Sequence, residues 1–197
     1  MKRIKFITIF FITASYLSAQ TNDLTQDQID DIQKEASDQI ERLQRNFEIL
    51  TDKNRSNEVK QHTHEETLRL FIGRGKSYED IYGNLQEPVY IQVSNLRTGA
   101  ITSRPIDEYL RRLRNLPNSK LVITKADFYY ISDICKVGDH YQAFATKFPD
   151  KHYPTHGRLV TNAPKIIQIL VDFAEDFAEK KTFVLLGDIE VTETVEF

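Results

Sequence analysis

The stretch from residue 158 to residue 197 constrains the fold more than any other part of the chain. Within it, two runs place apolar side chains at every second position, which is the spacing of half-buried β-strands. The apolar positions are Ile167, Ile169, Val171 and Phe173 in the first run, and Ile189, Val191 and Val195 in the second. An acidic turn separates the runs. The pattern predicts two antiparallel strands with one packed face and one wet face.

A helix is the alternative for residues 165–180. Pro164 suits the first position of a helix, and the apolar residues Ile166, Leu170, Phe173 and Phe177 also recur at steps of three and four. Several β-branched residues in the same run favour a strand instead. The sequence leaves both interpretations open, and we expect the strand.

The first residues have the order of a secretory signal peptide. Lys2, Arg3 and Lys5 precede a short apolar run at residues 6–12, and small residues follow up to Ala19. The apolar run is too short to cross a bilayer. We therefore expect cleavage after Ala19 and export to the periplasm or the extracellular space.

The net charge of the mature chain argues against two classes of binding partner. Of the 26 Lys and Arg, 23 remain after cleavage, against all 29 Asp and Glu, so the mature chain carries a net charge of −6. This balance argues against nucleic acid and against an anionic membrane surface. Cys135 is the one cysteine, which excludes an intramolecular disulfide and predicts a small buried side chain.

After the signal peptide, the sequence indicates one domain, which consists of a helix and a polar break at residues 20–57 and a remainder at residues 58–197. The spacing within it predicts helices and strands in the following order. A capping box of Thr25 and Gln28 opens a helix at 26–51. A second helix at 58–72 should bury Val59, Leu68, Phe71 and Ile72 and end at Gly73. There follow a strand at 89–94, a turn at 98–99, a short strand, a helix after Pro105, and a hairpin of residues 121–133 and 137–148.

This order of elements resembles the NTF2-like family, which includes nuclear transport factor 2, ketosteroid isomerase and scytalone dehydratase. The segments 68–73, 109–113 and 186–189 also resemble those of uncharacterised exported proteins of Bacteroidota-type bacteria. The resemblance implies an α+β fold, in which three helices of the N-terminal half pack on a curved antiparallel sheet of long C-terminal strands. It also implies a pocket at the open end of a cone, and dimerisation through the convex face of the sheet.

By this resemblance, side chains of the 121–148 hairpin line the pocket. The polar and aromatic candidates are Asp127, Phe128, Tyr129, Tyr130, His140 and Tyr141. Side chains alternate along a strand, so Asp127 and Tyr129 share one face while Phe128 and Tyr130 share the other. The sequence does not choose between the faces. An isomerase would need a base and an oxyanion donor, for which Asp127 with Tyr129, or His140 with Tyr141, are candidates.

Motifs for phosphate and metal binding are incomplete. Gly73 to Ser77 ends like a phosphate-binding loop, but Leu70 stands where that loop needs glycine. His62 and His64 lie two apart on a helix, so they point in different directions and should occupy a solvated face. Asp150, His152 and His156 form at best a weak cluster in a loop. We expect no metal and no cofactor.

Three basic residues, Arg111, Arg112 and Arg114, cluster on the third helix and should form a solvated face paired with acids. Function stays open among three classes. Our first hypothesis is a non-catalytic module that binds a small molecule or an envelope protein; the others are a small isomerase or dehydratase and a cell-envelope assembly component. A pocket with aromatic walls would favour a small ligand, and an exposed apolar patch on the first helix or outer sheet would favour a protein.

Overall fold

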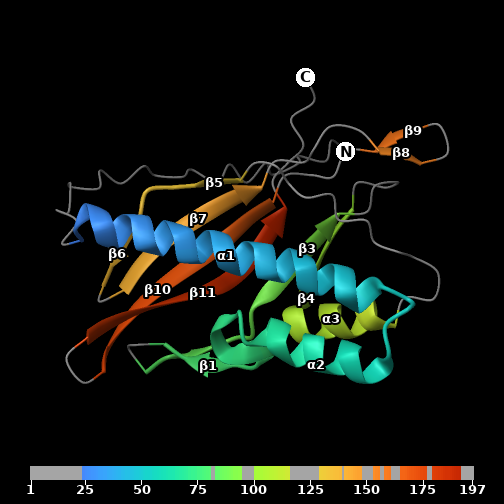
Figure 1. The fold of residues 1–197 in the computed structure, drawn as a ribbon, viewed down its shortest axis with the longest axis horizontal. Coiled ribbons are helices and arrows are strands. Elements are labelled where there is room, and N and C mark those ends of the chain that lie inside the picture. Colours follow the sequence, from blue (N-terminus) through green and yellow to red (C-terminus); the bar gives the residue numbers. More distant parts are fainter. Residues whose placement is uncertain are drawn as a thin grey trace, which may run out of the picture.

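A computed structural model describes residues 24–80, 83–94, 100–115, 129–138, 140–147, 153–155, 158–160, 165–176 and 179–191. In this part of the chain, three α-helices pack on a mixed β-sheet (Figure 1). The helices are α1 (Gln26–Thr51), α2 (Asn57–Leu68) and α3 (Ile106–Arg114), and a 3-10 turn, η1 (Ile72–Gly75), follows α2. No helix among the described residues is both long enough and apolar enough to span a membrane.

The strands fall into one large sheet and two short ribbons. The large sheet contains β3 (Tyr90–Ser94), β4 (Ile101–Pro105), β5 (Tyr129–Ile131), β6 (Cys135–Val137), β7 (His140–Lys147), β10 (Lys165–Asp176) and β11 (Glu179–Val191). The ribbons pair β1 (Tyr78–Glu79) with β2 (Leu85–Gln86), and β8 (Tyr153–Thr155) with β9 (Arg158–Val160). The predicted signal peptide, the turn at 98–99, and Asp150, His152 and His156 lie outside the described residues.

Helix α1 has the predicted bounds and the predicted capping box. The Thr25 side chain accepts a hydrogen bond from the backbone N–H of Gln28, whose side chain accepts one from the backbone N–H of Thr25. Its buried face is an apolar stripe of Ile32, Ala36, Ile40, Leu43, Phe47 and Leu50. Each fully buried aliphatic side chain contributes about 1.5–3 kcal/mol, so this stripe fixes α1 across the sheet (Figure 1).

Helix α2 departs from the prediction in both its end and its inner face. It ends at Leu68 rather than Ile72, because Phe71 takes an extended backbone with φ −105° and ψ 146° and forms a β-bridge with Leu186. Gly73, Arg74 and Gly75 then take positive φ angles of 67°, 51° and 78°. A Cβ at Gly73 would lie 2.7 Å from Cδ1 of Tyr78, so glycine is required there. The predicted inward Val59 is 43 % exposed. The helix instead buries four polar residues: Lys60, Thr63, His64 and Thr67.

The C-terminal pair is a strand ribbon, which rules out the helical alternative for residues 165–176. β10 and β11 pair antiparallel, and Ile167, Ile169 and Val171 are buried as predicted. The pairing shifts between Ile167 and Ile169, where Gly187 and Asp188 together oppose Gln168. A Cβ at Gly187 would collide with the Gln168 side chain, which explains a glycine in this strand.

The sheet is mixed: the long C-terminal strands β7, β10 and β11 pair antiparallel as predicted, and β3 adds a parallel pair that the sequence did not predict. The strand order is β4-β3-β11-β10-β7-β5, and β3 runs parallel to β11 with Ile91 opposite Ile189. Two side chains reinforce this junction. Asp188 accepts a hydrogen bond from the Tyr90 backbone N–H at 2.7 Å, and Gln92 accepts one from the Val191 N–H at 3.1 Å. Such a pairing joins segments far apart in sequence, which no local pattern reports.

The predicted 121–148 hairpin is present in part. β7 pairs with both β5 and β6, and residues 132–134 between these two strands leave the ladder, so the first arm is not one continuous strand. The turn contains Gly138 with φ 65°, as predicted. Residues 121–128 lie outside the described part. Cys135 is exposed, so the prediction of a buried cysteine is wrong.

Candidate functional site

Of the predicted pocket residues, the structure places Tyr130 and Tyr141 on opposite faces of the sheet. Tyr130 is 61 % exposed, whereas Tyr141 is buried on the helix-covered face. His140 and Tyr141 are neighbours in β7, and adjacent strand residues face opposite sides of a sheet, so they cannot act together on one substrate. Tyr129 is described only by its backbone, paired with Lys147. Asp127 and Phe128 lie outside the described residues, and their pocket role stays a prediction.

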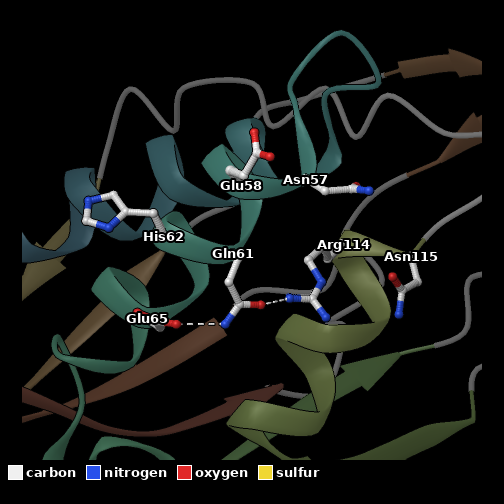
Figure 2. A pocket seen from close by; sticks show the side chains of 7 residues that line it. All are labelled: Asn57, Glu58, Gln61, His62, Glu65, Arg114 and Asn115. Carbon is white, nitrogen blue, oxygen red and sulfur yellow. Dashed lines mark hydrogen bonds between the residues drawn. The ribbon is translucent and has the colours of Figure 1, made fainter.

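A polar groove of about 620 Å³ lies between α2 and the end of α3 (Figure 2). Seven of the described residues line it, and none of these seven is hydrophobic: Asn57, Glu58, Gln61, His62, Glu65, Arg114 and Asn115. Five of the seven come from one face of α2, because residues three and four apart in a helix are neighbours. The sequence shows this polar face, but the opposing wall depends on how α3 packs.

A hydrogen-bond relay crosses the groove. The Arg114 guanidinium donates to Oε1 of Gln61, and Nε2 of Gln61 donates to Oε1 of Glu65 at 2.7 Å (Figure 2). The relay fixes the orientation of the Gln61 amide, since its oxygen faces a cation and its nitrogen faces a carboxylate. Figure 2 also shows the His62 ring turned away from Gln61 and Arg114.

The arginines of α3 are not equivalent. Arg111 donates to Asp107 at 2.6 Å, and Arg112 donates to Glu108 at 3.0 Å, as predicted for a solvated face. The hydrogen bond from Arg112 is the main cause that lowers the pKa of Glu108. Arg114 has no carboxylate within ion-pair distance among the described residues. It is therefore the one arginine of this helix whose charge faces the groove without an opposite charge.

A second polar bridge, buried rather than open, joins the same two helices. Nε2 of His64 lies 2.7 Å from Oδ1 of Asp107, and the other carboxylate oxygen accepts from Arg111. A carboxylate can only accept, so Nε2 carries the proton. Nδ1 of His64 is buried without a hydrogen-bond partner. The prediction that His64 lies on a solvated face is wrong, while His62 is exposed as predicted.

These groups do not form a metal centre. Among the described residues, no three His, Cys, Asp or Glu side chains are arranged to hold a metal ion. His62 and His64 point to different sides of α2, as their spacing predicts. The η1 turn is also no phosphate-binding loop that opens a helix, since β1 follows it.

The second surface of interest is the sheet face opposite α1, which we call the open face. Along β7, β10 and β11 the residues under the helices are buried, and the alternate residues are half-buried or exposed. Several of these alternate positions carry large apolar groups: Phe144, Ile166, Leu170, Phe183 and Leu185. Tyr130 of β5 lies on the same face, and so do polar residues such as Gln142, Thr146 and Gln168. Phe144 and Phe183 are each 43 % exposed. The alternation along the C-terminal strands predicts a wet face here and does not indicate the aromatic residues that it carries.

The groove and the open face differ in chemistry. The described lining of the groove is two carboxylates, one guanidinium, three amides and one imidazole, whereas the open face carries large aromatic and aliphatic side chains among polar ones. A comparison with family models, with curated proteins and with solved structures finds no match to this chain.

Proposed function

We propose that this chain is an exported, non-catalytic module of the NTF2-like type that binds a protein through the open face. The observation that carries the proposal is the exposure of Tyr130, Phe144 and Phe183 on a sheet face that no described helix covers. Exposed apolar patches on soluble proteins mark interaction sites. The NTF2-like part rests on the order of the elements, with two helices, two strands of the large sheet, a third helix and then the long strands.

The composition of the open face favours a protein over a small molecule. Gln142, Leu170 and Leu185 form an uncharged row of the sheet between Phe144 and Phe183. Polar residues border this row, since Gln168 pairs with Phe144 and Asp172 pairs with Phe183. Interface centres are depleted in charge and enriched in aromatic residues. The partner that fits is a protein with a largely apolar contact surface.

Site-specific photo-crosslinking tests this proposal. A benzoylphenylalanine at position 144 or 183 should crosslink to a protein in cells of the source organism. The same residue at position 112, on exposed α3, should not. Adducts of equal yield at all three positions, or none at 144 and 183, would overturn the proposal. An adduct of twice the chain mass would identify the partner as a second copy, and fractionation of the same cells would test export.

A further inference from the structure

The groove between α2 and α3 presents charges of both signs that the described residues leave unpaired. On the α3 side, Arg114 meets only the neutral oxygen of Gln61. On the α2 side, Glu58 lies in the first turn and makes no ion pair among the described residues. The positive end of the helix dipole favours the ionised form of a carboxylate in this turn. The groove therefore offers a cation on one helix and an anion on the other.

Glu65 and Gln61 already make hydrogen bonds within the groove, so a ligand is expected to bind mainly to the other lining residues. The Gln61 amide joins Arg114 to Glu65 and uses its oxygen and one N–H in doing so. A guanidinium has five N–H donors, so Arg114 keeps donors for a second acceptor. Asn115 follows Arg114 and adds an amide on the same wall. This wall suits a carboxylate, because a guanidinium binds carboxylates with two parallel hydrogen bonds.

The size and lining of the groove indicate a small and strongly polar ligand. A volume of about 620 Å³ lies in the usual range for small-molecule sites, about 300–1,000 Å³. None of the described lining residues is apolar, so an apolar ligand would gain little by burial against them. A simple anion would meet Glu58 and Glu65, and a simple cation would meet Arg114.

We propose that this groove binds a small zwitterion, with its carboxylate on Arg114 and Asn115 and its ammonium on Glu58. The proposal does not rest on the open face, which lies on a different surface, so either can fail alone. The ligand is a zwitterion because Arg114 on α3 and Glu58 on α2 carry opposite charges on neighbouring helices.

Titration of the ¹⁵N-labelled mature chain, followed by amide chemical shifts, tests the proposal. The probes are glycine, 4-aminobutanoate and 6-aminohexanoate, which increase the separation between the two charges. Butanoate and butylammonium each carry only one of the charges and serve as controls. At least one zwitterion should shift the amides of residues 57–65 and 114–115, with an affinity at least fivefold above that of either control. Equal affinities, or no shifts, would overturn the proposal.

Two substitutions assign the charges, each with a matched control. Arg114→Gln should weaken the best zwitterion at least fivefold, whereas Arg112→Gln on the same helix should not change its binding. Glu58→Gln should weaken it similarly, and Glu41→Gln, exposed on α1, should not. Because all four residues are at least partly exposed, the variants should fold. Binding that survives Arg114→Gln or Glu58→Gln would contradict the assignment.

Discussion

Helices α1 and α2 bury side chains of opposite chemistry. α1 buries an apolar stripe, whereas α2 buries Thr63, His64 and Thr67. The hydroxyls of α2 are satisfied within their own helix, since Thr63 donates to the Val59 carbonyl and Thr67 to the Thr63 carbonyl. Of these three residues, His64 is the one whose partner, Asp107, is distant in sequence. Burial therefore holds α1 without directional demands, while α2 also makes directional contacts with α3 through His64 and Gln61.

The largest expected loss of stability comes from a substitution in the apolar stripe of α1. Ile40 is 1 % exposed at the centre of the α1 stripe. Ile40→Ala should reduce the free energy of unfolding by about 3–4 kcal/mol, because it removes buried methyl groups and leaves a cavity. Urea denaturation measures the loss. Glu41→Ala, exposed next to it, should change stability by less than about 0.5 kcal/mol. Similar losses in both variants would show that α1 is not held by its stripe.

High pH should weaken the seam between α1 and α3. The rings of Phe47 and Tyr109 meet edge to face with centroids 5.8 Å apart, and burial raises the pKa of Tyr109 to about 12. The folded chain thus resists ionisation that the unfolded chain undergoes near pH 10. This stabilisation is complete below pH 10, and about 2–3 kcal/mol should be lost as the pH rises to about 12. Unfolding at a series of pH values measures it.

The matched control for this effect is Tyr109→Phe, which keeps the ring and removes the ionisable hydroxyl. Its free energy of unfolding should fall less between pH 10 and pH 12 than that of the native chain. An equal fall in both proteins would assign the pH dependence to other groups.

The buried polar contact between α2 and α3 depends on Asp107. Asp107→Ala should cost about 2 kcal/mol, because it leaves the buried Nε2–H of His64 without an acceptor. Glu108→Ala, which removes the exposed ion pairs of the neighbouring residue, should have a much smaller effect. The double variant His64→Leu with Asp107→Leu should recover part of the loss, since neither polar group is then left unpaired. If the double variant recovers no stability, the packing of these side chains, and not their hydrogen bond, holds α2 in place.

The same contrast explains how far the sequence could be interpreted. The bounds of α1, the strand ribbon and the turn at Gly138 follow from local spacing and capping, and these predictions are confirmed. The inner face of α2 was assigned wrongly, because threonine and histidine look solvent-facing unless their partners are known. Asp107 lies 43 residues from His64, so no local pattern reports that contact.

The groove and the mixed sheet escaped prediction for the same reason. The polar face of α2 is visible in the spacing of Glu58, Gln61 and Glu65, but the position of Arg114 opposite it depends on helix packing. The parallel pairing of β3 with β11 likewise joins distant segments. The fold class was predictable from local periodicity, whereas the two surfaces that carry the proposals arise from contacts between elements.

The smallest expected effect is the most direct test of whether α2 satisfies its own buried hydroxyls. Thr67 is fully buried, and its hydroxyl donates to the Thr63 carbonyl at 2.6 Å. Thr67→Val replaces that hydroxyl with a methyl group of similar shape, so the free energy of unfolding should change by less than about 1 kcal/mol. Urea denaturation beside Asp107→Ala makes the comparison. A loss as large as that of Asp107→Ala would mean that α2 needs its hydroxyls for more than local bonding, and that its polar face is a cooperative network.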